Sequence, residues 1–271
     1  MATRSRLAVA TAAAVGTIYG VQGLSPALPV VQRHLGLTDS ELGLFTAAYM
    51  LPAVVFAMPL GYLADRVGRR RVFVSMTLLW SVAGALQAWA GSSPALMALR
   101  VLQGIGFAAL MPLSVTLIGD ALEGAAQLRA QASRQVIMQV GELVWPLVGA
   151  ALAAFSWRAP LAAQLALLPL AVAGVRVLDD HATAVAQSTR GYARELAGAV
   201  RAPGMPAVLT AGFVRFWCKF AVVAYVPLML VREAGASIGQ GALVVAITSL
   251  FAALASTRVM PALRRVPASR L

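Results

Sequence analysis

Charged residues are scarce in this chain of 271 residues. They make up 12% of it, about half the share of an ordinary soluble domain, and only ten of them are acidic. Hydrophobic residues make up 60%, and the mean hydropathy is +0.79. A chain so poor in charge has too few polar side chains to cover a surface in water. The composition therefore excludes an ordinary soluble domain and favours an integral membrane protein.

Cysteine and histidine are almost absent as well. The one cysteine, Cys218, rules out an internal disulfide, and it stands in an apolar run where we expect a small packed side chain. The sequence shows no metal-ligand spacing of His, Cys, Asp and Glu, no phosphate-binding glycine loop before a helix, and no Ser-His-Asp set outside the apolar runs. We therefore expect no enzyme, no metal and no cofactor.

Long apolar runs take up most of the chain, and eight of them reach the roughly 17–25 residues that a membrane-spanning helix needs. The first run is too long for the core of a cleaved signal peptide, so it is interpreted as a span. The eight predicted spans are residues 7–31, 43–64, 72–90, 95–118, 135–154, 159–178, 206–231 and 240–257.

The net charge of +12 comes from arginines in the turns between these runs. If the N-terminus is cytoplasmic, 16 basic residues, Arg134 among them, lie on the inner side and 3 on the outer side. Cytoplasmic turns collect Lys and Arg, so the count predicts a multi-pass protein of the plasma (inner) membrane with both termini in the cytoplasm. Because the arginines form no single stripe, nucleic acid is not an expected partner.

The turn at residues 61–71 is the most informative segment. Four arginines in six residues separate two apolar runs, so the turn is expected at the water edge. The pattern Gly61-x-x-x-Asp65-Arg66-x-Gly68-Arg69-Arg70 resembles the loop between helices 2 and 3 of the major facilitator superfamily of secondary transporters. The resemblance implies that Asp65 meets helix 11 in one conformation. It also implies gating by five residues: Gly61, Asp65, Arg66, Gly68 and Arg69. The alternative is that the arginines only set the topology.

Other segments resemble the same family. The paired prolines Pro26 and Pro29 and the run Arg100-x-x-Gln103-Gly104-x-Gly106 match signatures of its first and fourth helices. The helix 5 motif of its drug and metabolite exporters resembles Gly141-x-x-x-Trp145-Pro146-x-x-Gly149-Ala150, with glycine normally standing where this chain has Trp145 and Ala150. The resemblance implies efflux by an antiporter.

Four charged residues lie well inside predicted spans. Arg100 stays protonated and cannot carry a proton itself, whereas Glu142 can, so we predict that the two residues serve proton coupling. The alternative is that Glu142 only neutralises an arginine such as Arg134 or Arg100. Arg215 and Lys219 are four residues apart and share a helix face.

The excess of positive charge inside the spans favours an anionic or zwitterionic solute. The alternative for Arg215 is that its side chain reaches out to the headgroups. The predicted substrate cavity contains Tyr19, Gln22, Gln103, Gln139, Arg215 and Lys219.

The predicted organisation is an all-α membrane bundle of the major facilitator type. Residues 1–178 are expected to form a complete N-terminal half of six helices, 179–205 a cytoplasmic linker with a short surface helix at 191–200, and 206–271 a partial C-terminal half with helices 7 and 8. Members of the family normally have twelve helices. The resemblance therefore implies a truncated or frameshifted product, or a chain completed by a second one.

Two functions remain open at this stage. The first is a secondary active transporter that exports a small organic solute by proton-coupled alternating access, with the lipid bilayer, the solute and protons as its partners. The second is a truncated membrane remnant that transports nothing, or a helix bundle that binds another membrane protein.

Overall fold

The structure is a computed structural model that describes residues 2–179 and, with gaps, residues 191–251. All regular secondary structure in the described residues is helical, and six helical segments are long and apolar enough to cross a membrane. These confirm the predicted integral membrane fold and its six-helix N-terminal half. The six segments are Thr3–Leu35, Asp39–Val67, Arg69–Trp89, Ser93–Ala121, Gly124–Phe155 and Ala159–Val177.

The first segment is a broken helix, although the sequence predicted one continuous span. It consists of α1 (Ala2–Gln22), the 3-10 turn η1 (Ser25–Ala27) and α2 (Leu28–Leu35). Pro26 and Pro29 stand in the first turns of η1 and α2, where the missing N–H would have no helical partner in any case. The two prolines therefore mark the breaks between α1, η1 and α2, and both lie within helical turns.

Helices α3 (Asp39–Val67) and α4 (Arg69–Leu86) are joined by a single residue, Gly68. The prediction of a loop over residues 61–71 was therefore wrong in its extent, because residues 61–67 continue α3 and residues 69–71 begin α4. Gly68 has a φ of +110°, which a residue without a side chain adopts readily. The start of α3 is fixed by a capping box between Thr38 and Glu41.

Helices α5 (Ser93–Ala121) and α6 (Gly124–Phe155) form the next two spans. The span predicted at 135–154 began too late, because the Ala, Gln, Leu and Arg residues before it favour helix although they are not uniformly apolar. Arg134 therefore has a different place from the one predicted. It lies inside α6 rather than in a cytoplasmic turn, and it is only 7% exposed.

The sixth span contains α7 (Ala159–Ala162), the 3-10 segment η3 (Ala163–Leu167) and α8 (Leu168–Val177). A further helix, α10 (Met205–Glu233), agrees with the predicted span at 206–231. The predicted span at 240–257 lies partly outside the described residues, and Gly239–Thr248 is its apolar helical part. Most of the predicted linker and its surface helix also lie outside the described residues.

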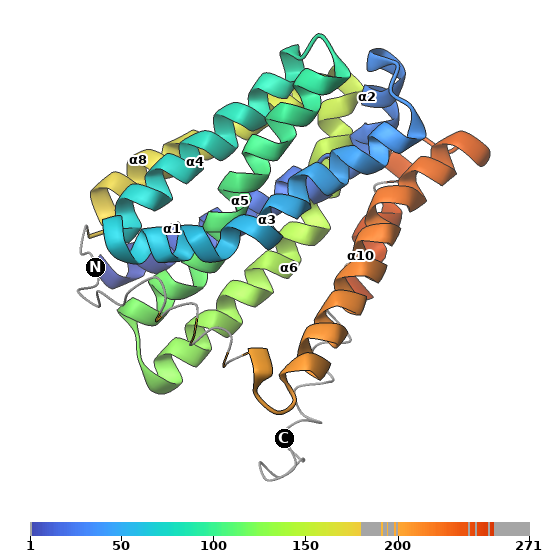
Figure 1. Ribbon diagram of the computed structural model, residues 1–271. Coiled ribbons are helices and arrows are strands. Elements are labelled where there is room, and N and C mark those ends of the chain that lie inside the picture. Colours follow the sequence, from blue (N-terminus) through green and yellow to red (C-terminus); the bar gives the residue numbers. More distant parts are fainter. Residues whose placement is uncertain are drawn as a thin grey trace.

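The bundle is built around α5, which packs against α1, α3 and α4, while α6 packs against α1, and α8 against α4. Figure 1 shows α10 standing beside this bundle, with one end close to α2. Contacts of α10 with η1 and α2 agree with that placement. The outer face of α3 is apolar and open, with Val54 79% exposed, as expected of a surface that faces lipid or another membrane helix.

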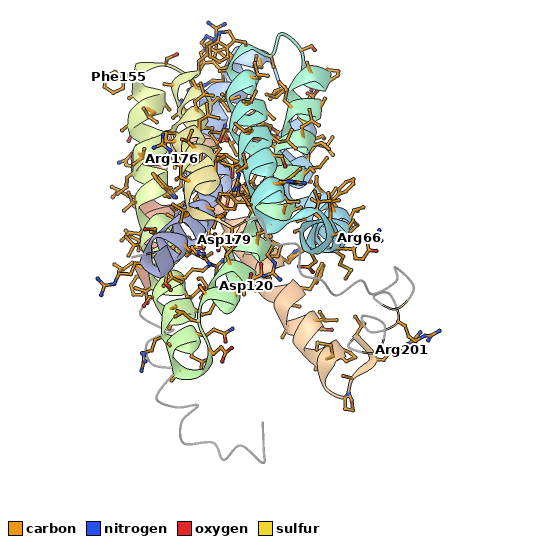
Figure 2. The ribbon with its side chains drawn as sticks, turned by 90° about the vertical axis from the view of Figure 1, so that its left-hand side faces the viewer. Arg66, Asp120, Phe155, Arg176, Asp179 and Arg201 are labelled. Carbon is orange, nitrogen blue, oxygen red and sulfur yellow. The ribbon has the colours of Figure 1, made fainter. Side chains whose placement is uncertain are left out.

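The two ends of the bundle differ in charge. In Figure 2, Arg66, Asp120 and Asp179 lie toward one end, and Phe155 lies at the other. Arg6 in α1 forms an ion pair with Asp179 after α8 at the charged end. We call it the arginine-rich end, because it carries the α3–α4 turn with Arg66 and Arg69 to Arg71.

Candidate functional site

Arg100 lies on α5, seven residues after its start at Ser93, and is only 1% exposed. Its Nε donates to the carbonyl oxygen of Phe45 at 3.1 Å, Nη1 to Oε1 of Gln103 at 2.8 Å, and Nη2 to the carbonyl oxygen of Gly20 at 2.6 Å. Its guanidinium carbon also lies 4.1 Å and 4.4 Å from the ring centres of Phe45 and Tyr49. One side chain thus ties α1, α3 and α5 together through hydrogen bonds and cation–π contacts.

A cluster of glutamines extends this network to α4 and η3. Gln87 donates to Oε1 of Gln103 at 2.9 Å, and the amide nitrogen of Gln103 donates to Oε1 of Gln164. Gln164 in turn donates to the carbonyl oxygen of Gly84 at 3.0 Å. All three glutamines are fully buried, so their mutual bonds offset the cost of removing three amides from water.

Tyr49 connects the same region to α1 and α4. Its hydroxyl donates to the carbonyl oxygen of Thr17 at 2.8 Å and accepts a hydrogen bond from Nε1 of Trp80 at 2.8 Å. Tyr49 has no exposed surface and Trp80 has 1%. The polar groups around Arg100 thus form a network that links α1, α3, α4, α5 and η3, although Oε1 of Gln87 has no hydrogen-bond partner among the described residues.

The helix 5 motif forms the contact between α6 and α1. Gly141, Trp145 and Gly149 are four residues apart and share one face of α6. Nε1 of Trp145 donates to the carbonyl oxygen of Val15 at 2.8 Å. A β-carbon at Gly149 would overlap the carbonyl oxygen of Gly23, and one at Gly141 would come within 2.9 Å of the Val15 side chain. The glycines therefore allow the two helices to touch, and Trp145 bonds across the contact.

A cavity of about 670 Å³ opens between α1, α5, α6 and η3. Most of its lining is apolar, and Trp145 forms part of its wall. Polar groups come from Thr11, Ser133 and Arg134. The cavity combines apolar surface with a cationic side chain inside a membrane-spanning bundle.

Arg134 borders this cavity. Its Nε donates to Oγ of Ser114 at 3.0 Å, and Nη2 lies 3.8 Å from the sulfur of Met111. Sequence reasoning missed the site because it placed Arg134 in a turn. The usable signal is the spacing of Arg134, Met138 and Gly141, which continues the buried stripe of α6 toward its start.

Arg69 organises the arginine-rich end. Its Nε and Nη2 donate to Oδ1 of Asp65 at 3.2 Å and 3.1 Å, and it forms an ion pair with Asp120 at the end of α5. The Arg69 side chain is 17% exposed. Asp120 was not predicted, although an acid at the end of a span next to an arginine-rich turn is a usable signal. The ion pair places the end of α5 level with the α3–α4 turn.

The other predicted gating residues lie around this ion pair. Arg66 stands 5.4 Å from the ring centre of Tyr62 on α3. A β-carbon at Gly61 would meet no atom within 4 Å, so this glycine faces open space in the described part of the chain. Within this chain, packing therefore does not require a glycine at position 61.

At the opposite end, Asp39 connects three helices. Its Oδ1 accepts a hydrogen bond from Gln32 of α2 at 2.8 Å and pairs with Nη1 of Arg232 of α10 at 2.6 Å. Nearby, a β-carbon at Gly43 would lie 3.1 Å from the hydroxyl of Tyr225 on α10. This end of α10 is therefore attached to α2 and α3.

The predicted cavity residues are spread over the bundle. Tyr19 donates to the carbonyl oxygen of Pro160 at 2.9 Å, and its ring meets Trp145 edge-on at 5.4 Å. Gln22 is 2% exposed, and neither of its amide atoms has a hydrogen-bond partner in the described part of the chain. Gln103 belongs to the Arg100 network.

The remaining predicted residues lie on α6 and α10. Gln139 and Glu142 are half-buried on α6, and Pro146 is buried inside the same helix. The side chains of Arg215 and Lys219 lie outside the described part of the structure, although both residues belong to α10. Among the described residues, no group of three or more His, Cys, Asp or Glu side chains has a metal-binding arrangement.

Comparison with known proteins places these features in a family. Residues 10–270 match the Major Facilitator Superfamily. The chain is 32% identical to the bacillibactin exporter of Bacillus subtilis over 51% of its own length and 36% of the relative's. It is 30% identical to the quinolone resistance protein NorA of Staphylococcus aureus over 59% of its length and 42% of the relative's.

Solved structures agree on the fold. A bacterial homolog of the human lysosomal transporter Spinster, in an inward-facing conformation, superposes with a TM-score of 0.72 at 20% identity, over 93% of this chain and 60% of that one. A D-xylose–proton symporter gives 0.72 at 18% identity, over 98% and 70%. Because residues 10–270 match its family pattern, the chain belongs to the Major Facilitator Superfamily.

Proposed function

We propose that this protein is a secondary active transporter that exports a small organic solute across the plasma membrane by alternating access. Membership of the superfamily and the names of the relatives, an exporter and a drug-resistance protein, support this. The matched segments cover 36% and 42% of those relatives, so their activities come to this chain as a proposal.

The observation that carries the proposal is the attachment of α10 at one end. Asp39 and Arg232 hold it to α2 and α3 at the end opposite the arginine-rich turn, with Tyr225 close by. Figure 1 shows the other end of α10 standing apart from α2. A contact of this kind at one side of the membrane would close the path there, as alternating access requires.

The arginine-rich end supplies the second gate of this proposal, with both termini in the cytoplasm. Arg69 already holds Asp65 and Asp120 together there. A helix that closed over this end would meet the open space at Gly61 and compete for the same carboxylates. Gly68 lets α3 and α4 reverse within one residue, which keeps the cluster compact.

Proton coupling is proposed to use Glu142 and Arg100. Arg100 is held by two carbonyls and an amide, which are neutral acceptors, so it supplies a fixed positive charge inside the bundle. Glu142 lies on α6, the helix that also lines the cavity through Arg134. The excess of cationic residues in the spans favours an anionic solute.

Distance measurements between spin labels test alternating access directly. Cys218→Ser removes the single cysteine, and labels are then introduced in pairs: Ser40 with Glu233 near the attached end of α10, and Ala125 with Leu209 toward the arginine-rich end. In lipid nanodiscs, we expect two populations in which one distance lengthens as the other shortens. Distances that never change between pH 5 and pH 8, or that change together, would contradict the mechanism.

The ion pair of Asp39 with Arg232 offers a variant and a matched control for this measurement. Arg232→Gln removes the cation from Asp39 and is expected to raise the fraction of molecules with the Ser40–Glu233 distance lengthened. Arg33→Gln removes a cation on α2 near the same end that is not paired with Asp39, and is expected to leave the fractions unchanged.

A further inference from the structure

We infer that the cavity between α1, α5 and α6 binds an amphipathic organic anion, with Arg134 contacting the acidic group and Trp145 the apolar body. The interpretation of this cavity as a substrate site rests on the transport function proposed above. The binding of an anion there does not depend on that function. Neither residue belongs to the set that the sequence assigned to a substrate cavity.

Arg134 carries a positive charge that its described hydrogen-bond partners do not neutralise. A charge within a membrane span costs at least several kcal/mol unless a partner compensates it. In the described part of the chain, the hydrogen bonds of Arg134 go to a serine hydroxyl and a thioether, which carry no charge. A guanidinium has five N–H donors, and these two partners account for two of them. The remaining donors suit a carboxylate or a sulfonate in the cavity.

Arg100 has different surroundings from Arg134. Arg100 is equally basic and more deeply buried, but its donors meet two carbonyls and an amide, and two aromatic rings cover its faces. It lines no part of the cavity. Arg134 borders the cavity and has no aromatic contact of this kind in the described part of the chain. The unbonded N–H donors of Arg134 are therefore next to a cavity that a ligand can enter, whereas Arg100 is not.

Arg134 and its partner Ser114 lie some distance from the end of the bundle. Ser114, the partner of Arg134, precedes the end of α5 at Ala121 by seven residues, about 10 Å along the helix. The ion pair of Arg69 with Asp120 sets that end level with the arginine-rich turn at the water edge. A lipid phosphate stays at headgroup level, so a solute fits this depth better than a lipid does.

The lining of the cavity is mostly apolar and extends along α6 from Arg134 to Trp145. Trp145 stands eleven residues after Arg134 on α6, about 16 Å along the helix. Its indole nitrogen is already bonded to the carbonyl oxygen of Val15, so the ring is held in place and offers an apolar surface. A cavity of about 670 Å³ is large enough for a molecule with an aromatic ring system.

Binding of tritiated 1-naphthaleneacetate to the purified protein in dodecyl maltoside tests the inference, with neutral 1-naphthaleneacetamide as competitor. The two probes have nearly the same shape and differ in charge. The wild-type protein is expected to prefer the acid about tenfold, or about 1.4 kcal/mol. Arg134→Gln should remove this preference, whereas Arg129→Gln, an exposed arginine on the same helix, should retain it.

Two further variants keep the test decisive if Arg134→Gln does not fold. Ser133 is exposed and lines the cavity, so its substitution disturbs no core packing. Ser133→Glu should weaken the acid about tenfold without affecting the amide, and Ser133→Lys should strengthen the acid. Equal binding of acid and amide by the wild-type protein, or an unchanged preference in Ser133→Glu, would overturn the inference.

A lipid occupant is tested separately. In nanodiscs of phosphatidylcholine the probe should bind as in detergent, and adding phosphatidylglycerol should leave its affinity unchanged. Displacement by phosphatidylglycerol would assign the cavity to a lipid and overturn the inference. The two proposals can fail separately. If the two spin-label distances change in opposite directions but the protein binds no anion, only the present inference is contradicted, because alternating access does not depend on the charge of the solute.

Discussion

Arg100 and Arg134 are both buried arginines in a membrane bundle, yet their surroundings differ. Arg100 donates to acceptors on three helices and lies between two rings, whereas Arg134 donates to one hydroxyl, approaches one sulfur and borders a cavity. The difference indicates that burial alone does not assign a role to an intramembrane charge. Access to a cavity distinguishes the two arginines: two rings cover Arg100, whereas Arg134 borders a cavity in which its remaining donors can meet a ligand.

The largest expected effect comes from Arg100→Gln. This change removes three hydrogen bonds from a charged donor and two cation–π contacts, so we expect a loss of about 4 kcal/mol in the free energy of unfolding. Thermal unfolding in detergent should shift downward by roughly 10 °C. The exposed Arg129→Gln is the control with the same loss of charge. Equal melting temperatures for the two variants would refute the structural role of Arg100.

Gly149→Ala tests the helix contact that bounds the Arg134 cavity. Its β-carbon would overlap the carbonyl oxygen of Gly23, so α1 and α6 must separate, at a cost of about 3 kcal/mol. Gly61→Ala is the matched control, because its β-carbon meets no atom within 4 Å and alanine favours helix. A stable Gly149→Ala protein with unchanged probe binding would show that the two helices are not in contact.

A pair of polar substitutions compares the acceptors of the two arginines. Gln103→Ala removes one hydrogen bond from each of Gln87, Gln164 and Arg100, and we expect it to cost about 2 kcal/mol. Ser114→Ala removes a single acceptor from Arg134 and should cost about 1 kcal/mol or less. Chemical denaturation of both variants measures the difference. The reverse order would contradict the contrast between the networks.

The smallest effect is expected at the arginine-rich end. Asp120→Asn weakens an ion pair whose carboxylate is 49% exposed, so the free energy of unfolding should fall by less than about 1 kcal/mol. Asp65→Asn and the double variant complete a double-mutant cycle around Arg69, read by thermal unfolding. If Asp120→Asn lowered the free energy of unfolding more than Arg100→Gln does, the ion pairs of Arg69 would stabilise the bundle more than the Arg100 network, contrary to this prediction.

Much of the fold followed from the sequence, since a helix in lipid must be long and apolar, and six such segments appear where they were expected. The contact of Gly141 and Gly149 with α1 could also be anticipated from small residues on one face of an apolar helix. The sequence therefore predicted the class of the bundle and its six N-terminal spans.

The cavity could not be predicted in the same way. The apolar window placed Arg134 before the start of its span, because helix formation extends into polar sequence that hydropathy leaves out. The ion pair of Arg69 with Asp120 and that of Asp39 with Arg232 join residues far apart in the sequence. Such partners depend on the rotation of each helix about its axis, which an almost uniformly apolar sequence specifies weakly.

The most direct test measures stability and anion binding on the same two preparations, Arg100→Gln and Arg134→Gln. The account predicts opposite outcomes: Arg100→Gln unfolds roughly 10 °C lower than the wild-type protein, whereas Arg134→Gln unfolds close to the wild-type temperature but no longer prefers 1-naphthaleneacetate to its amide. If Arg134→Gln retained that preference while losing as much stability as Arg100→Gln, both arginines would be structural and the account would be contradicted.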